Sequence, residues 1–364
     1  MKRIIVGVLI AAAFPAGAAA QQPTVYSSLP LDGASRVQTK AVNDGARRAL
    51  REAGNPVRFV ALNGGTKRAG SWTPGATARN ARRVARDASA VAYIGEFNSG
   101  ASKVSIPILN RAGIPQISPS TTYNGLTTSG AGTTSGEPGR YFPTGVRTYF
   151  RILPNDHVQA AALVTAMRDR GCTALAFVHD GEVYGKGMNA DAVATAARLG
   201  LPVVASRKIS RGAPAAIKRA GANCMAYTGI TANGAVRLFR SSALKRMQLF
   251  GSDGVAEVGF IRPLPRSVER RTTVMVATVF SDTFKNRDLY YQYGYESMKL
   301  ILDGLAASGG TRAGLLGWLP TVQGRQSVLG TYGFDANGDT TLRTYGVYGV
   351  RGSSLVYKGA ITAA

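Results

Sequence analysis

The sequence predicts an α/β fold of two similar lobes with a ligand cleft between them. Short apolar runs alternate with amphipathic helical segments over residues 24–124, which is typical of a parallel sheet covered by helices. A segment rich in glycine, serine and threonine, 127–145, interrupts this alternation, and a second series follows it. Two successive series predict two lobes, and small ligands commonly bind between such units.

The first twenty residues are expected to be a signal peptide rather than part of the fold. Lys2 and Arg3 form a basic start, residues 4–13 form an apolar stretch too short to span a bilayer, and 18–20 is an alanine-rich cleavage site. The alternative is a buried N-terminal strand or helix. No cysteine follows the apolar stretch, so no lipid anchor is expected. We therefore expect cleavage near Ala20 and a periplasmic or secreted protein.

The first lobe is predicted to contain four strands and three helices. Each strand is a short apolar run, and each helix has an apolar face at helical spacing. The expected strands are 24–28, 57–62, 91–95 and 114–117, and the expected helices are 35–53, 76–88 and 99–112. The segment 127–145 is interpreted as an irregular excursion before a lobe crossing. A phosphate-cradling loop is the alternative, but the segment lacks the terminal Lys-Ser/Thr.

The second lobe is predicted to begin at Tyr149. The expected strands are 149–153, 173–179, 203–206, 224–229, 247–250 and 273–279, with helices 156–170, 185–199, 213–220 and 232–243 between them. A long helix, 288–307, and three short strands within 329–357 complete the chain. The first lobe is then 23–148 with 280–326, and the second is 149–279 with 327–364. Residues 335–339 are interpreted as a plain turn, because no glutamate follows at the spacing of a calcium loop.

Two polar loops follow neighbouring strands of the first lobe. Residues 98–102 come after the strand 91–95, and residues 118–122 come after the strand 114–117. The carboxyl ends of parallel strands form the usual ligand-binding edge of an open α/β sheet. Ser99 and Gly100 also lie at a helix N-terminus, whose free N–H groups favour an anion. The sequence therefore predicts a carboxylate-binding cradle, with an ordinary pair of polar βα loops as the alternative.

Strand ends of the second lobe supply the complementary charge. The segment HDGEVYG presents Tyr184, and FGSDGV presents Asp253. A carboxylate that faces a carboxylate-binding cradle is what a zwitterion requires, so Asp253 is expected to bind an ammonium group. Tyr184 is expected to contact the side chain of the ligand. The alternative for Asp253 is a simple Asp-Gly turn.

The sequence offers no catalytic or metal-binding constellation. There is no G-x-S-x-G motif, and neither cysteine has metal-ligand spacing to another ligand. His179 and Asp180 could act as an acid/base pair, but no partner nucleophile accompanies them. We therefore expect a protein without enzymatic activity, cofactor or metal.

The net charge of +24 raises the possibility of a nucleic-acid partner. The arginines are dispersed over separate helices without interleaved aromatic residues, so solvated helix faces are the favoured interpretation and no nucleic acid is expected. Cys172 and Cys224 each precede an apolar strand. If these strands are neighbours, both cysteines lie at one sheet edge, and a disulfide is expected in an exported protein. Two buried free thiols are the alternative.

Four segments resemble the branched-chain amino-acid binding proteins of ABC transporters, the Leu/Ile/Val-binding family of type 1 periplasmic-binding proteins. These segments are YIGEFNSGASKVSIPILNRAGIPQISPSTT, HDGEVYGKGM, GITANGAVRLF and FGSDGVAE. The resemblance implies two Rossmann-like lobes joined by three crossovers, which close on the ligand by a hinge motion. It also implies an amino-acid ligand, branched-chain or otherwise apolar, an ABC permease as partner, and a monomer. An amide, urea or aromatic acid as ligand, or a diverged sensor of the same fold, is the alternative.

The resemblance assigns roles to individual residues. Ser99, Ser120 and Thr122 correspond to residues of the carboxylate-binding loops, Asp253 to the ammonium-binding acid, and Tyr184 to the aromatic contact. Ile230 falls on a pocket position that is often aromatic in relatives. Relatives also place an aromatic residue in the region 36–38, where this sequence has none. The short helix 213–220, and the segment 279–289, where relatives often have a helix, depart from the family and could impair binding.

Overall fold

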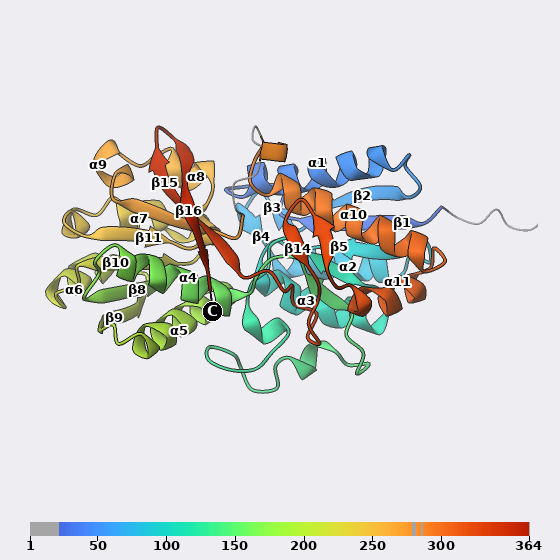
Figure 1. Ribbon diagram of the computed structural model, residues 1–364, viewed down its shortest axis with the longest axis horizontal. Coiled ribbons are helices and arrows are strands. Elements are labelled where there is room, and N and C mark those ends of the chain that lie inside the picture. The colour runs from blue at the N-terminus through green and yellow to red at the C-terminus, as the bar shows by residue number, and fades with distance from the viewer. Residues whose placement is uncertain (1–21, 279–281, 285–286, 364) are drawn as a thin grey trace, which may run out of the picture.

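The computed structural model describes residues 22–278, 282–284 and 287–363, which form two α/β lobes side by side (Figure 1). The predicted signal peptide and its cleavage site lie outside the described residues. The fold class is the one that the sequence predicted: parallel sheets with helices on both faces, in two lobes joined by three chain crossings.

The sheet of the first lobe has five parallel strands in the order β2-β1-β5-β6-β7. Their bounds are Thr24–Leu29 for β1, Arg58–Asn63 for β2, Ala90–Ile94 for β5, Gln116–Ser118 for β6 and Tyr149–Arg151 for β7. The strands are short apolar runs, and their side chains enter two separate hydrophobic clusters, one on each face of the sheet.

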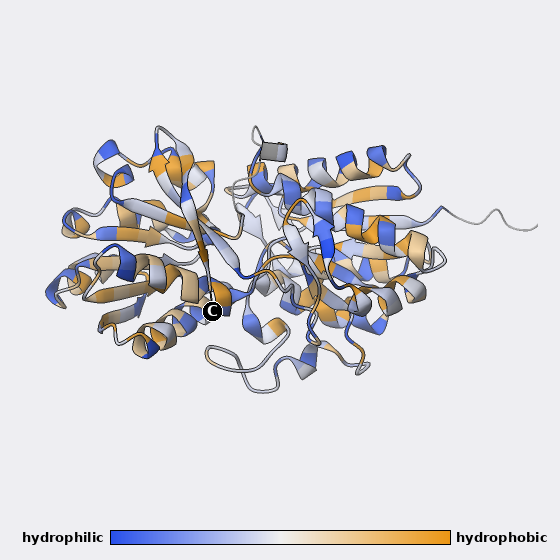
Figure 2. Ribbon diagram, viewed as in Figure 1, coloured by the Kyte–Doolittle hydropathy of each residue, from blue (hydrophilic) through white to orange (hydrophobic). Residues whose placement is uncertain are grey.

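The five helices of the first lobe supply side chains to these two clusters. Helices α1 (Arg36–Glu52) and α10 (Tyr291–Ala307) contribute to one cluster, and α2 (Pro74–Ala85) and α3 (Ser99–Arg111) to the other. Helix α11 (Arg312–Trp318) follows α10. Gly45 and Gly294 allow α1 and α10 to pack closely, because a Cβ at Gly294 would lie 1.8 Å from the carbonyl oxygen of Val42. Figure 2 shows polar residues on the outer sides of these helices and apolar residues toward the sheet.

The sheet of the second lobe has seven strands in the order β16-β15-β12-β11-β10-β8-β9. The bounds are Leu175–His179 for β8, Val203–Lys208 for β9, Cys224–Thr228 for β10, Gln248–Gly251 for β11, Thr272–Val276 for β12, Thr344–Arg351 for β15 and Ser354–Thr362 for β16. Strands β15 and β16 are antiparallel to their neighbours, and the other pairs are parallel.

Six helices flank this second sheet. Helices α4 (Asp156–Asp169) and α5 (Val183–Arg198) lie against each other and supply one cluster of buried side chains. The other cluster receives side chains from α6 (Ala213–Arg219), α7 (Ala235–Phe239), α8 (Val258–Ile261) and α9 (Arg266–Glu269). The short helix predicted at 213–220 is therefore present.

Three sequence predictions about the chain path are wrong. Tyr149–Arg151 does not begin the second lobe but pairs with β6 as the fifth strand of the first sheet. The return to the second lobe does not fall at residue 327, because the hairpin of β13 (Arg325–Ser327) and β14 (Gly330–Tyr332) stays against α10. There the Tyr332 hydroxyl donates to Glu296 Oε1 at 2.8 Å. An apolar strand does not reveal in its own residues which sheet edge it will join.

The third wrong prediction is the single helix over 232–243. Gly234 has a φ of +96°, a left-handed conformation that a continuing α-helix cannot contain, and the segment divides into short helical turns around α7. The segment 279–289 lies partly outside the described residues. Its described part contains one short helical turn at Asp282–Phe284.

A buried ion pair joins the first and third crossings between the lobes. Arg151 Nε lies 2.6 Å from Asp339 Oδ1, and both side chains are almost wholly buried. Arg151 also donates to the carbonyl oxygen of Tyr123 at 2.9 Å. The segment 335–339 is a turn, as predicted, since Asp335 Oδ1 accepts from the N–H groups of Asn337 and Asp339. This pair therefore ties two of the three chain crossings to each other.

Cys172 and Cys224 are bonded to each other in the structure. They lie at the start of the neighbouring strands β8 and β10, whose register places Cys224 opposite Leu175. This is the edge of the sheet opposite to the strand ends that face the cleft.

Candidate functional site

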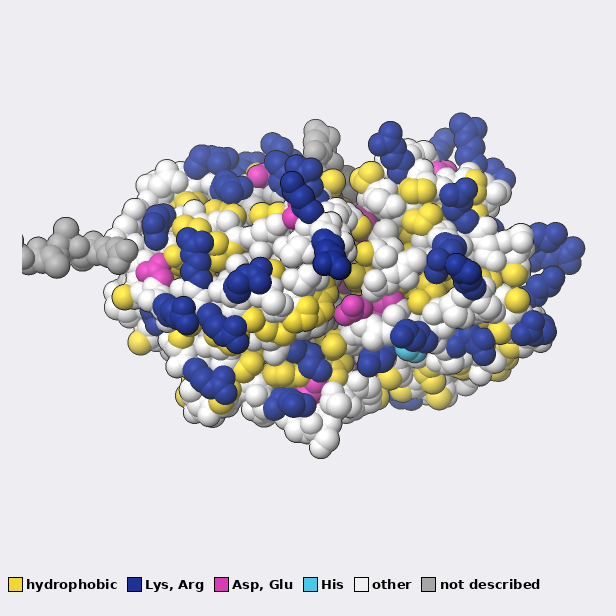
Figure 3. Space-filling model, turned by 180° about the vertical axis from the view of Figure 1, so that it is seen from behind, with side chains coloured by type: hydrophobic (Ala, Val, Ile, Leu, Met, Phe, Trp, Pro, Cys, Tyr) yellow, Lys and Arg dark blue, Asp and Glu magenta, His cyan; other side chains and the backbone are white. Residues whose placement is uncertain are grey.

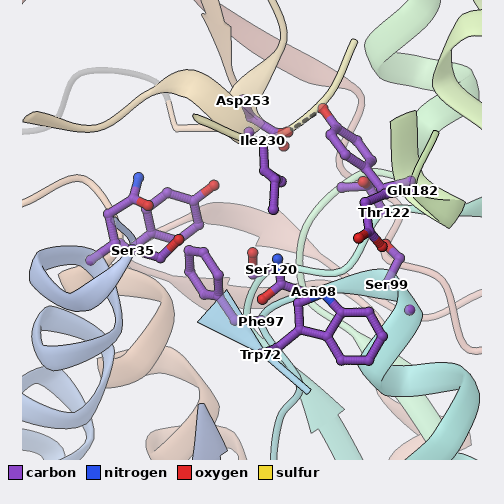
Figure 4. Close-up of a pocket in the computed structure, with 15 residues that line it drawn as sticks. Ser35, Trp72, Phe97, Asn98, Ser99, Ser120, Thr122, Glu182, Ile230 and Asp253 are labelled. Carbon is purple, nitrogen blue, oxygen red and sulfur yellow. Dashed lines mark hydrogen bonds between the residues drawn. The ribbon is translucent and has the colours of Figure 1, made fainter. Parts of the chain in front are cut away.

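A pocket between the lobes, with an empty volume of about 510 Å³, contains all seven residues predicted to bind ligand (Figure 4). The predicted residues that line it are Ser99, Gly100, Ser120, Thr122, Tyr184, Ile230 and Asp253. Eight more residues line it that were not predicted individually, although the predicted segments 98–102 and 36–38 contain two of them: Ser35, Gln38, Trp72, Phe97, Asn98, Glu182, Gly254 and Tyr290. That the seven predicted residues bind a ligand remains a prediction, but the fold does bring them together around one pocket.

The first lobe lines the pocket with hydroxyl groups and a helix N-terminus. Helix α3 begins at Ser99 with no acidic residue in its first turn, so no side-chain carboxylate of that turn competes for its free N–H groups. Ser120 and Thr122 are buried in the loop after β6 and face the pocket. Thr121, between them, turns into the lobe and hydrogen-bonds to Ser118 Oγ at 2.7 Å. Ser120 and Thr122 thus line the cleft on either side of Thr121, and their hydroxyls also interact with Tyr290 and Asp156, respectively.

Gly100 is required by the indole ring of Trp72. A Cβ at Gly100 would lie 2.5 Å from Trp72 Cζ2, which no real Cβ tolerates. Trp72 belongs to a small hairpin of β3 (Gly65–Thr66) and β4 (Ser71–Trp72) that follows β2. The ring thus covers the start of α3 and forms one wall of the pocket.

The second lobe faces these donors with the carboxylate of Asp253. The Tyr184 hydroxyl lies 2.7 Å from Asp253 Oδ1 and 2.8 Å from Gln159 Oε1, whereas Asp253 Oδ2 has no hydrogen-bond partner among the described residues. Burial raises the pKa of the Asp253 carboxyl to about 6. A buried acceptor without a partner is costly, so this oxygen is suited to a ligand donor, preferably a cation.

Asp180 positions the second-lobe loops rather than acting as an acid/base. Its Oδ2 accepts from the N–H of Ile230 and from the Asn233 side-chain amide, both at 3.0 Å, and its Oδ1 accepts from the N–H of Glu182 at 2.9 Å. The loops that follow β8 and β10 are therefore held side by side. Burial lowers the pKa of neighbouring His179. These hydrogen bonds give Asp180, in the segment HDG at 179–181, a structural role that requires no acid/base catalysis.

Aromatic side chains that sequence reasoning missed line the pocket. Phe97 and Tyr290 lie with ring centroids 5.1 Å apart, and Trp72 adds a third ring. Phe97 could have been found, because it directly precedes the polar loop that begins at Asn98. Trp72 and Tyr290 come from a hairpin and from the segment before α10, and no local signal links either of them to the strand ends.

The pocket is acidic although the protein is strongly basic. Its lining includes the carboxylates of Asp253 and Glu182, and among the residues that line it there is no lysine, arginine or histidine. Lysine and arginine side chains are instead spread over the outer surface (Figure 3). This distribution favours a ligand that brings positive charge into the cleft.

A family model described as "Periplasmic binding protein" matches residues 28–254, a range that contains all seven predicted site residues. The chain belongs to the periplasmic binding protein family. No curated protein matches it in sequence. Proteins of this family and the structural neighbours bind solutes without transforming them, so the chain is a solute-binding protein and not an enzyme.

Solved structures of similar fold bind different small molecules. A leucine binding protein from Thermotoga maritima has a TM-score of 0.78 at 18% identity, over 93% of this chain and 99% of that chain. A branched-chain amino acid transporter substrate binding protein from Streptococcus pneumoniae, in complex with isoleucine, has a TM-score of 0.72 at 15% identity, over 94% and 99%. A solute binding protein from R. palustris, in complex with benzoate, has a TM-score of 0.75 at 16% identity, over 94% and 97%. At these identities the similarity shows the fold and leaves the ligand open.

Within the described ranges, no group of three or more His, Cys, Asp or Glu side chains is placed to hold a metal ion. In the same part of the chain, no helix has the length and apolar character needed to cross a bilayer.

Proposed function

We propose that this periplasmic binding protein is the extracytoplasmic receptor of an ABC importer, which closes on an α-amino acid and delivers it to the permease. The proposal includes export by the N-terminal segment and a monomeric receptor, as the sequence predicts. The observation that supports it most is the free Oδ2 of buried Asp253 on one side of a pocket whose other side has hydroxyls and free helix N–H groups. An α-ammonium and an α-carboxylate satisfy both sides together.

The carbon part of the ligand side chain has apolar walls. Ile230 projects into the pocket from the second lobe, and Phe97 and Trp72 line it from the first (Figure 4). These groups support the expected branched-chain or other apolar side chain, because burial of each methylene against them contributes about 0.8 kcal/mol. Specificity in this proposal lies with these walls, since the cradle and Asp253 bind the part that all amino acids share.

An aromatic carboxylate is the second candidate. Trp72, Phe97 and Tyr290 offer ring contacts, and one neighbour of similar fold holds benzoate. Benzoate has no cation, however, and would leave the carboxylate of Asp253 buried without compensation beside an added negative charge. The charges of the pocket therefore favour an amino acid.

The test is calorimetric titration of the mature, ligand-free protein with L-leucine, L-isoleucine, benzoate and two truncated leucine analogues. The analogue 4-methylpentanoate lacks the ammonium, and 3-methylbutylamine lacks the carboxylate. We expect amino acids to bind, both analogues to bind at least tenfold more weakly, and a saturating amino acid at a hundredfold over its Kd to stabilise the fold by about 2.7 kcal/mol. Tighter binding of benzoate than of any amino acid would contradict the proposal.

A further inference from the structure

Glu182 places a second carboxylate in the pocket, in addition to that of Asp253. It directly precedes helix α5, and its side chain lines the cavity together with Thr122 and Tyr184. No ion pair or side-chain hydrogen bond involves this carboxylate anywhere in the described residues. Partial burial and the nearby Asp180 raise the pKa of the Glu182 carboxyl, while Lys186 opposes this effect.

The loop geometry puts Glu182 next to the expected side-chain contact. The backbone N–H of Glu182 and the backbone N–H of Ile230 both donate to the carboxylate of Asp180, at 2.9 Å and 3.0 Å. The buried carboxylate of Asp180 thus holds Glu182 and Ile230 side by side, just after the carboxyl ends of the adjacent strands β8 and β10. We therefore expect a ligand side chain that runs along Ile230 to pass close to Glu182.

The charge of the pocket is not balanced by an amino acid with an uncharged side chain. Such a ligand brings one ammonium, which Asp253 uses, and one carboxylate, which the first-lobe cradle uses. Glu182 would then remain uncompensated in a closed cleft that has no basic side chain in its lining. A second positive group on the ligand removes this cost.

We propose that Glu182 binds a cationic group at the end of the ligand side chain, so that the protein prefers a cationic amino acid over an apolar one of equal length. This inference rests on the proposed function, because it assumes that Asp253 and the cradle bind the amino-acid backbone. The apolar stem of such a side chain packs against Ile230 and Phe97, while its charged end reaches Glu182. Apolar amino acids still bind, but more weakly.

The lysines around Glu182 do not replace a ligand cation. Lys186 lies four residues further along α5 and points to solvent, and the Lys208 side chain lies beside Gly181. Neither amine comes within 4.0 Å of the Glu182 carboxylate, as no such ion pair occurs among the described residues. A purely structural role for Glu182 at the start of α5 is also disfavoured, because the helix has no side-chain cap from it.

The test compares L-lysine with L-norleucine, which has the same carbon chain without the side-chain ammonium. Both are titrated into the mature wild-type protein, into Glu182→Gln and into Asp169→Asn, which neutralises an exposed carboxylate at the far end of α4. We expect the wild type and Asp169→Asn to bind lysine about tenfold more tightly than norleucine. Glu182→Gln should lose this preference, because it should bind lysine more weakly than the wild type does and norleucine at least as tightly.

Three outcomes would count against the inference, and they are distinguishable. Norleucine binding as tightly as lysine to the wild type would overturn the role of Glu182 and leave the proposed function intact. An equal loss for both ligands in Glu182→Gln would assign the residue to loop structure. If no amino acid binds at all, the proposed function itself fails and the inference fails with it.

Discussion

Gln38 and Ala256 are joined by a hydrogen bond that spans the cleft. The Gln38 Nε2 donates to the carbonyl oxygen of Ala256 at 2.8 Å, and the Gln38 side chain is buried. Gln38 lies in the first turn of α1 in the first lobe, whereas Ala256 follows the turn that contains Asp253 in the second. The bond therefore joins the two lobes at the wall of the pocket, which Gln38 also lines.

Removal of the Gln38–Ala256 hydrogen bond should weaken ligand binding, because it destabilises the closed arrangement of the lobes. Because one hydrogen bond contributes about 1 kcal/mol net, Gln38→Ala is expected to weaken amino-acid affinity about fivefold. The change should appear mainly in the dissociation rate, measured by surface plasmon resonance or stopped flow. Gln248→Ala, at an exposed position on β11, is the matched control. Unchanged dissociation in Gln38→Ala would show that the bond does not contribute to closure.

Neutralisation of Asp253 should stabilise the ligand-free protein at neutral pH while removing its binding. Burial raises the pKa of this carboxyl to about 6, from 3.8 in an unfolded chain. The folded state therefore binds more protons than the unfolded state between these values, so stability falls as the pH rises from about 4 to 6. Above pH 6 the destabilisation is complete, at about 3 kcal/mol. Asp253→Asn should remove this destabilisation. We therefore expect the ligand-free variant to have a higher Tm than the ligand-free wild type at pH 8, but not at pH 4.

Ligand affinity should rise with pH, whereas the stability of the ligand-free protein falls. The ammonium requires ionised Asp253, so wild-type affinity for an amino acid is expected to be constant above pH 7 and to fall as the pH drops below 6, by up to tenfold per unit. Titration calorimetry from pH 4.5 to 8 measures this profile. A flat profile would place the ammonium away from Asp253.

The sequence predicted the fold and half of the pocket because both depend on local patterns. Alternating strands and helices identify parallel sheets, and polar residues after apolar strands identify the ligand-binding edge, so Ser99, Ser120 and Asp253 could be found. Trp72, Gln38 and Tyr290 reach the same pocket from a hairpin, a helix side and a chain crossing. Their positions at the pocket depend on how the two lobes pack against each other, and local sequence patterns do not reveal this packing. The placement of β7 failed for the same reason.

Alanine at position 100 should impair the pocket through Trp72. The added Cβ would lie 2.5 Å from Trp72 Cζ2, so the indole must move and its wall of the cavity is lost. We expect Gly100→Ala to weaken amino-acid binding at least tenfold and to lower stability by about 1–3 kcal/mol, as overpacking does. Gly212→Ala is the matched control, because a Cβ there meets open space before α6. Tryptophan fluorescence, to which Trp72 and Trp318 both contribute, should change in the first variant alone, and normal binding in Gly100→Ala would contradict the proposed cradle.

Loss of the Cys172–Cys224 bond should lower stability without changing the ligand site. The bond closes a loop of 52 residues at the sheet edge that lies opposite the cleft. Chain-entropy arguments give about 4 kcal/mol for a loop of this length, so the double variant Cys172→Ala, Cys224→Ala should unfold at markedly lower denaturant concentration. Its amino-acid affinity should match the wild type at temperatures where it stays folded, because the bond lies at the sheet edge opposite the strand ends that face the pocket. Treatment of the wild type with reductant should reproduce the stability loss, and an equal unfolding midpoint with and without reductant would show that the pair is not bonded in solution.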